Sequence, residues 1–157
     1  MLTVQGNLAI TYDALGLDER ALLMKRDVYF GELKLYGAEH IETLASANNY
    51  AMSLANLERV EEARSLVLKM MPVARRVLGD NDEITLKMRR NYAQTLYMDD
   101  SATLDDLREA VMENEELERT ARRVLGGAHP LVVGIEGKLR NARAVLRARE
   151  TPPAGDK

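Results

Sequence analysis

Apolar residues recur at the spacing of amphipathic helices in seven stretches of the chain, and no stretch alternates polar and apolar residues as a half-buried strand would. The first stretch, for example, places Val4, Leu8 and Tyr12 on one helical face before Gly16 breaks the pattern. The pattern therefore predicts an all-α protein, with helices over about residues 2–15, 18–36, 41–56, 59–78, 83–98, 103–125 and 130–150.

Residues at the ends of these stretches are typical of helix starts and stops. Asp18 is the expected N-cap of the second helix, and Gly37 and Gly79 are expected to end the second and fourth helices. Thr103 and Asp106 have the spacing of a capping box at the start of the sixth helix. Pro72 lies inside the fourth predicted helix, where it removes a backbone hydrogen bond and should cause a kink.

The sequence repeats itself at a fixed step. The Asn-Tyr-Ala tripeptide at residues 49–51 returns 42 residues later at 91–93, and Asn-Leu-Ala stands at 7–9, one step earlier. The tripeptide Val-Leu-Gly at 77–79 returns at 124–126, so about five residues are added within the third unit. A period of this length indicates stacked repeats, which we divide into units 1–37, 38–79 and 80–126 and a capping helix over 129–150.

The composition fits a folded helical domain and excludes several other classes. Apolar residues make up 46% of the chain and charged residues 30%, which argues against disorder outside a polar Pro/Gly tail at 151–157. A net charge of −3 favours neither nucleic acid nor an anionic membrane as a partner, and the apolar runs are too short to span a bilayer. The expected location is cytoplasmic.

No residue pattern indicates catalysis, a cofactor or a metal. The chain has no cysteine, and its two histidines, His40 and His129, occupy the same joint of two different units, too far apart to share a ligand. Adjacent acidic residues such as Glu61 and Glu62 point about 100° apart on a helix and are expected to be solvated. The sequence therefore predicts a protein that is not an enzyme.

Several repeated residues resemble those of tetratricopeptide repeats. Small residues recur in the first helix of each unit (Ala9, Ala51, Ala93) and in the second (Ala21, Ala63, Ala110), together with the Glu-Glu-Ala at 61–63. The 42-residue period and the joint Val-Leu-Gly-Gly-Ala-His-Pro at 124–130 resemble the long repeats of the kinesin light chain type. This resemblance covers about residues 2–149 and implies a right-handed superhelix of antiparallel helix pairs, acting as a scaffold or adaptor for other proteins.

The resemblance also implies that the first helix of each unit lines a concave groove that binds a partner peptide. The residues that this implication places in the groove are Asn7, Asn48, Asn49, Met52, Lys87, Arg90, Asn91 and Gln94. Asn7, Asn49 and Asn91 are spaced by one unit each, and a carboxamide can donate to and accept from a bound main chain at the same time. The alternative is that each asparagine joins its helix to the neighbouring one.

Basic residues are concentrated in the fifth and seventh predicted helices. The fifth helix carries Lys87, Arg89 and Arg90 with no acidic residue between 84 and 98, and the seventh adds Lys138 and Arg140. One hypothesis is a positive groove that prefers an acidic ligand, and the alternative is a solvated charged face. A nucleic-acid partner is not expected, because the chain is acidic and has few aromatic residues.

Self-association is the main competing function. Leu2, Val4 and Leu8 would leave the N-terminal end of the array apolar, and an array must cover such an end. The sequence is therefore also compatible with a homodimer formed through this end, or with the C-terminal part of a longer array that has no ligand of its own.

Overall fold

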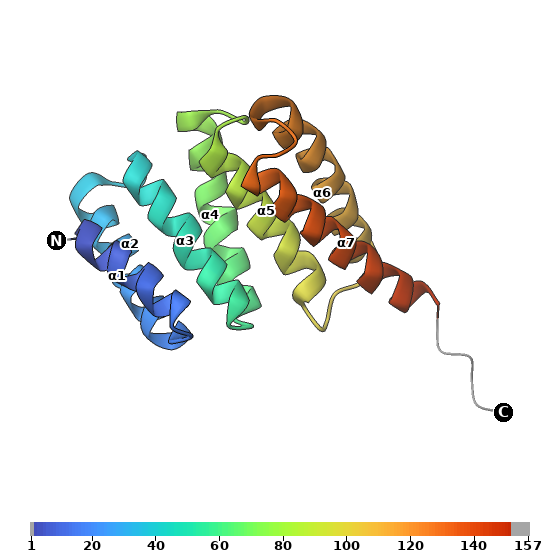
Figure 1. Cartoon of the computed structure of the whole chain (residues 1–157), viewed down its shortest axis with the longest axis horizontal. Helices are drawn as coiled ribbons and strands as arrows, with labels where there is room; N and C mark the ends of the chain where they lie inside the picture. Colours follow the sequence, from blue (N-terminus) through green and yellow to red (C-terminus); the bar gives the residue numbers. More distant parts are fainter. Residues whose placement is uncertain (1, 152–157) are drawn as a thin grey trace.

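The computed structural model describes residues 2–151, without the side chains of residues 2–4, 7, 10 and 13. Within residues 2–151 the chain forms seven helices and no strand (Figure 1). The helices are α1 (Leu2–Ala14), α2 (Asp18–Tyr36), α3 (Ile41–Asn56), α4 (Val60–Leu78), α5 (Glu83–Met98), α6 (Leu104–Leu125) and α7 (Pro130–Glu150). The predicted fold class is confirmed, and each helix begins and ends within one residue of its predicted range. The tail beyond residue 151 and the side chain of Asn7 lie outside the described residues.

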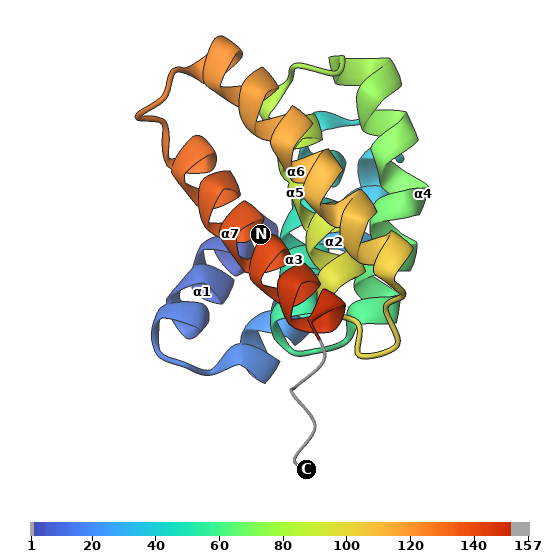
Figure 2. The same ribbon diagram turned by 90° about the vertical axis from the view of Figure 1, so that its right-hand side faces the viewer.

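Each helix packs against the next one in the chain, and the odd-numbered helices also contact one another. In the described residues, the backbone of α5 closely approaches those of α3 and α7, whereas the backbones of α2, α4 and α6 do not approach one another, and α2 meets α4 through side chains such as Tyr29 and Met70. The layer of α3, α5 and α7 is therefore the more closely packed one and forms the inner side of the curve. Figure 2 looks along the array from the end formed by α6 and α7.

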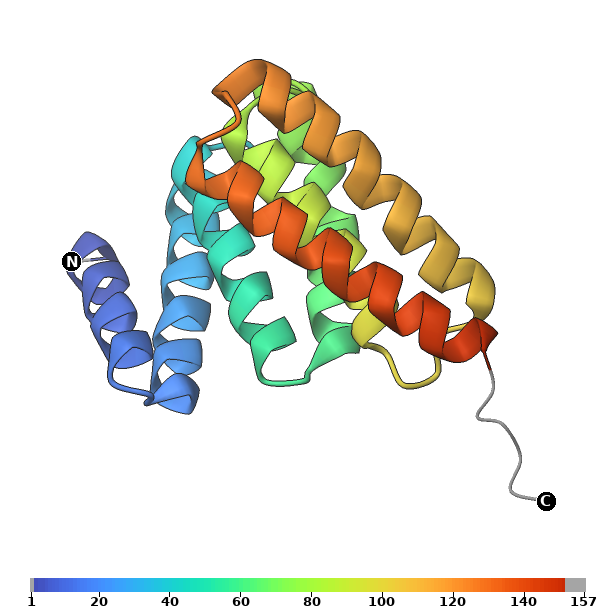
Figure 3. The same cartoon turned by 45° about the vertical axis from the view of Figure 1, so that its right-hand side comes forward.

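The first helix is the exception in this layer. Among the described residues, the backbone of α1 closely approaches that of α2 but not that of α3 (Figure 3). The joint between the first two units is therefore open on the inner side, while the corresponding joints between α3 and α5 and between α5 and α7 are closed.

The repeated small residues lie where the helices approach most closely. Ala51 and Ala63 in the second unit and Ala93 and Ala110 in the third are at most 1% exposed. Larger apolar side chains fill the space around them, for example Leu44 and Met70 between α3 and α4. The apolar stripes of neighbouring units thus share one elongated core, as the repeat pattern predicts.

Most of the predicted helix ends are confirmed. Gly37 and Gly79 follow α2 and α4 with φ values of 83° and 93°, a left-handed conformation that glycine adopts without strain. Thr103 and Asp106 form the capping box at the start of α6. The prediction for Asp18 is wrong: it is the first residue of α2, and Leu17 holds the N-cap position without a side-chain hydrogen bond. As a first-turn carboxylate, Asp18 still interacts favourably with the helix dipole. Helix α4 continues through Pro72.

Candidate functional site

The repeat places one pair of facing residues at each joint of the inner layer. At the joint of α3 and α5 this pair is Asn48 and Asn91. The Asn91 Nδ2 donates to the Oδ1 of Asn48 at 2.9 Å and lies 3.4 Å from the Asn48 carbonyl oxygen. Both side chains are buried, with exposed fractions of 4% and 1%. The structure thus places Asn91 in the inter-helix role that the sequence left open as an alternative.

One unit further along, at the joint of α5 and α7, the same two positions hold cations. Arg90 lies 42 residues after Asn48, and Lys138 lies 47 residues after Asn91. The Arg90 guanidinium packs against α7, with Nη1 3.5 Å from the point that a Cβ on Gly134 would occupy. A hydrogen-bonded amide pair at one joint is therefore replaced by two positive charges at the next.

Neither cation has an acidic partner within the described part of the chain. The Nη2 of Arg90 contacts the sulfur of Met52 at 3.8 Å and the Oδ1 of Asn91 at 3.5 Å. Its Nε is buried without a hydrogen-bond partner. None of the ion pairs of the described residues includes Arg90 or Lys138.

The ionisation of this pair reflects its surroundings. Burial lowers the pKa of the Arg90 guanidinium. Burial and then repulsion by Arg90 lower the pKa of the Lys138 ammonium. Both pKa values are lowered for the same reason: the surroundings of Arg90 and Lys138 disfavour a positive charge that has no negative partner.

Two residues beside this pair were not predicted from the sequence. Burial raises the pKa of the Tyr97 phenol to about 12, although a hydrogen bond with Asn141 and the charge of Arg90 oppose the shift. A signal for Asn141 was present, because it lies 47 residues after Gln94, which the sequence placed in the groove. Tyr97 carried no such signal, since the corresponding residue of the previous unit is Ala55.

The joint of α1 and α3 holds the third version of the same pair. Gly6 stands 42 residues before Asn48 and has no side chain, and a Cβ at Gly6 would meet no atom within 4 Å. Asn49, the counterpart of Asn91, is exposed. Its Oδ1 lies 3.4 Å from the Nδ2 of Asn48 on the same helix. Of Asn49 and Asn91, the two repeated asparagines whose side chains the structure describes, Asn49 is therefore the one that is accessible to a ligand.

The other predicted groove residues are less free. Lys87 pairs with Glu83 of its own helix at 2.6 Å, and the buried Gln94 donates from Nε2 to the sulfur of Met98. Arg89 points to the opposite side of α5, where its Nε lies 2.7 Å from the Oε1 of Glu113. The predicted residues that the structure brings together are thus Asn48, Asn49, Met52, Arg90 and Asn91.

The two histidines, which occupy equivalent joints of the repeat, both cap helices. The Nδ1 of His40 accepts a hydrogen bond from the backbone of Glu42, and the Nδ1 of His129 accepts one from Leu131. Among the side chains that the structure describes, no three histidine or acidic residues are arranged to hold a metal. None of the described helices combines the length and the apolar character needed to cross a membrane.

Comparison with known proteins agrees with this geometry. Residues 43–83 match the family model of the tetratricopeptide repeat. Two crystal structures of the nearly identical TPR-like repeats of a Podosopora anserina kinesin light chain share 22% sequence identity with the chain. The TM-score is 0.70 for the structure of a single-substitution variant and 0.67 for the other structure. Each alignment covers 95% of this chain and 68% of the other.

A third solved structure, BtubC (BKLC) from P. vanneervenii, gives a TM-score of 0.67 at 16% identity and covers 99% of this chain and 67% of the other. No curated protein matches the chain. Residues 43–83 are thus a tetratricopeptide repeat, and the array as a whole has the fold of kinesin light chain-like repeat proteins. Repeats of this kind imply a protein-interaction scaffold.

Proposed function

We propose that the chain is a protein-interaction module, without a catalytic role, whose inner face of α3, α5 and α7 binds a peptide segment of a partner protein. The observation that carries this proposal is the pair of Arg90 and Lys138, which face each other across α5 and α7 without an acidic partner in residues 2–151. A carboxylate of the bound segment would lie between the two cations.

Electrostatics favours this assignment over a purely structural role. At the joint of α3 and α5 two neutral amides hold the helices together, which shows that the joint does not require charge. Replacing the amides with two partly buried cations costs stability through repulsion and desolvation. A carboxylate from a ligand would remove both costs and form charge-assisted hydrogen bonds with the guanidinium.

Neighbouring groups extend the site along the inner face. Met52 contacts Arg90 from α3 and offers an adaptable apolar surface. Asn49 is exposed on the same helix and can donate to and accept from a peptide main chain. A segment that crosses from α7 to α3 would thus meet two cations, then a thioether and then an exposed amide.

A peptide array tests the proposal directly. The native chain is applied to acidic, neutral and basic peptides at low and high salt, beside the Lys138→Asn variant, which restores the residue type found at the equivalent positions 49 and 91. We expect the native chain to prefer acidic peptides, more strongly at low salt, and Lys138→Asn to bind them about tenfold more weakly. Lys87→Gln is the matched control, because Lys87 is already paired with Glu83. Binding that ignores peptide charge, or equal losses in both variants, would contradict the acidic site.

Self-association through the N-terminal end remains a second candidate. Leu8 is 41% exposed on α1, and the joint behind it is open. Sedimentation at increasing protein concentration measures this function. A strict monomer at high concentration excludes it.

A further inference from the structure

A hollow lined by residues of α2, α3 and α4 lies away from the inner layer. It has a volume of about 380 Å³. Tyr29 and Phe30 of α2 and Tyr50 of α3 contribute three aromatic rings to its lining, and Leu54 and Leu66 contribute apolar surface. The peptide-binding face proposed above uses α3, α5 and α7, so this hollow is a separate place on the molecule.

The three rings form a connected aromatic surface. The ring centroids of Tyr29 and Phe30 are 5.0 Å apart and tilted by 51°, and those of Tyr29 and Tyr50 are 6.1 Å apart and nearly parallel at 28°. Tyr29 is buried, and its hydroxyl points to the sulfur of Met70. Phe30, the single phenylalanine of the chain, is 54% exposed, so its ring is accessible to a ligand.

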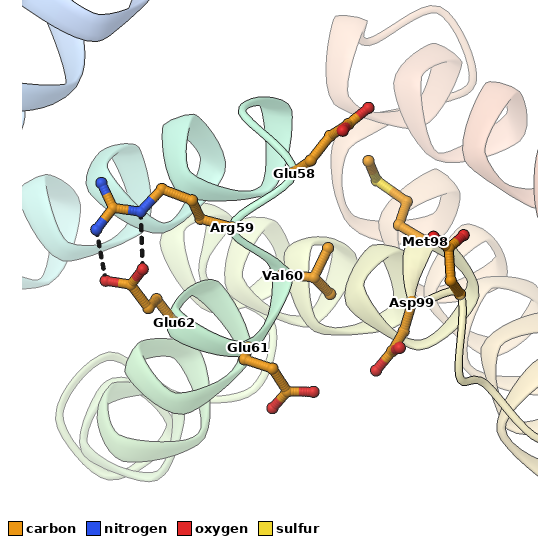
Figure 4. A pocket seen from close by; sticks show the side chains of 8 residues that line it. Glu58, Arg59, Val60, Glu61, Glu62, Met98 and Asp99 are labelled. Carbon is orange, nitrogen blue, oxygen red and sulfur yellow. Dashed lines mark hydrogen bonds and ion pairs between the residues drawn. The ribbon is translucent and has the colours of Figure 1, made fainter.

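Carboxylates stand at one rim of this aromatic surface. Glu61 and Glu62, from the first turn of α4, line the hollow, and they also line a neighbouring cavity of about 480 Å³ with Glu58 and Asp99 (Figure 4). Glu62 is held by two hydrogen bonds from Arg59, each 2.7 Å long. The Glu61 side chain is 78% exposed, and its carboxylate lies 3.6 Å from Arg64 and also interacts with the side chain of Asp99, so it is held less tightly than Glu62.

The corresponding positions of the third unit are built differently. There the hydroxyl of Tyr92, the counterpart of Tyr50, donates to Glu109, the counterpart of Glu62, at 2.9 Å. No such bond joins Tyr50 and Glu62 in the described structure, and the positions of Tyr29 and Phe30 are taken by Met71 and Pro72. The aromatic hollow with an exposed carboxylate is therefore specific to the joint of α2 and α4 and does not follow from the repeat.

We propose that this hollow binds an arginine side chain of a partner protein. A guanidinium stacks well on aromatic faces, and its attraction to a ring adds to its attraction to a carboxylate. The exposed ring of Phe30 would support the flat guanidinium, the apolar walls would hold its methylene stem, and Glu61 would accept its N–H groups. The exposed Lys69 lines the hollow as well and opposes a cation, so it weakens the site without blocking it.

The single phenylalanine provides a direct readout. Biosynthetic labelling with 4-fluorophenylalanine places one ¹⁹F nucleus in the whole chain, at residue 30. The probes are acetyl-Gly-Arg-Gly-amide, the same peptide with Lys, and the same peptide with Glu, each titrated into the labelled native chain. We expect a saturable shift of the ¹⁹F resonance with the arginine peptide, weaker binding of the lysine peptide and no saturable shift with the glutamate peptide.

Three variants separate the proposed contacts from general charge effects. Glu61→Gln should weaken binding of the arginine peptide about threefold, and Lys69→Gln should strengthen it by a similar factor. Glu109→Gln changes the equivalent of Glu62 in the third unit and should leave binding unchanged. Circular dichroism verifies that each variant is folded. A linear shift without saturation, equal shifts for the three peptides, or equal affinities of Glu61→Gln and the native chain would overturn the proposal. Because the labelled ring lies outside the inner face, failure here leaves the peptide-array result unaffected.

Discussion

Asn91 and Asn48 join α5 to α3 through a buried side-chain hydrogen bond of 2.9 Å. The two residues belong to neighbouring units and occupy adjacent positions of the repeat. At the next joint the same positions bring Arg90 and Lys138 together, and at the preceding joint they are Gly6 and Asn49. The same pair of repeat positions thus forms a hydrogen-bonded clamp at one joint, holds two cations without acidic partners among the described residues at the next, and lies at the open joint of α1 and α3.

The clamp makes different stability predictions for two residues that the repeat treats as equivalent. Asn91→Ala removes the donor and leaves the buried Asn48 oxygen without this partner, which should lower the free energy of unfolding by about 1–3 kcal/mol. Asn49→Ala removes an exposed side chain and should change stability by less than about 0.5 kcal/mol. Urea denaturation followed by circular dichroism measures both. Equal losses would show that Asn91 does not clamp the helices.

The lowered pKa of Lys138 predicts a pH dependence of stability. The folded chain releases this proton at lower pH than the unfolded chain, whose ammonium keeps its ordinary pKa of 10.5. Between these two values the folded state binds fewer protons, so the free energy of unfolding should rise as the pH increases toward 10.5. Comparing the native chain with Lys138→Met isolates this contribution, and the variant should show the smaller rise.

The raised pKa of Tyr97 acts in the opposite direction and at higher pH. Its folded value of about 12 exceeds the ordinary value of 10.0. The folded state therefore keeps a proton that the unfolded state loses, and stability should fall as the pH rises from 10 toward 12. Denaturation series for the native chain and Tyr97→Phe should diverge above pH 10 and run parallel below it. If the pH profiles of the two proteins already diverge at neutral pH, the difference in stability comes from packing and not from ionisation of Tyr97.

Much of the architecture could be predicted from the sequence because the repeat constrains it at several levels at once. The 42- and 47-residue steps placed His40 and His129 at equivalent joints, and both cap a helix. Gly37 and Gly79 ended helices as expected, because only glycine adopts their backbone conformation without strain. Asp18 was misplaced by one position, since Asp is favoured both as an N-cap and in the first turn.

The site was less predictable, because sequence spacing fixes the position of a residue and not the packing around it. Asn49 and Asn91 share one repeat position, yet Asn91 is buried by contact of α3 with α5 and Asn49 is left exposed where α1 does not reach α3. Among the basic residues, Arg89 is neutralised by Glu113 while Arg90, its neighbour in sequence, meets no acid in residues 2–151. Adjacent helical residues point about 100° apart, and the sequence alone does not say which one faces the inner side.

The ion pair of Arg89 and Glu113 is specific to the third unit and can be exchanged for the apolar version of the second. The side chain of Arg89 is 7% exposed, and its loss would leave Glu113 uncompensated at 21% exposure. Arg89→Ala should therefore cost roughly 3 kcal/mol. The double variant Arg89→Ala/Glu113→Leu installs the residues of the second unit, Ala47 and Leu66, and should recover most of this loss. Urea denaturation of both variants decides, and a double variant no more stable than the single one would contradict this prediction.

Glu58 adopts a backbone conformation that suits glycine. Its φ of 61° is close to the 69° of Gly16, which holds the same place in the turn of the first unit. A side chain in this region is strained by about 1–2 kcal/mol, and glycine relieves the strain at some entropic cost in the unfolded chain. We expect Glu58→Gly to raise the free energy of unfolding by up to about 1 kcal/mol. Glu58→Ala removes the same charge but keeps the Cβ, so a similar gain in this variant would assign the effect to charge instead of strain.

The open joint at α1 predicts a gradient of local stability along the inner layer. Because the backbone of α1 packs closely only on α2 among the described helices, its amide hydrogens should exchange faster than those of α3 and α5, which have close neighbours on both sides. Gly6 lies inside α1, and a Cβ there would meet no atom within 4 Å, so Gly6→Ala should stabilise the helix by about 0.5–1 kcal/mol. Hydrogen exchange followed by mass spectrometry would then show slower exchange in α1 and unchanged exchange in α5. Equally slow exchange of α1 and α3 in the native chain would mean that the first joint is closed in solution, by α3 or by a second copy of the chain.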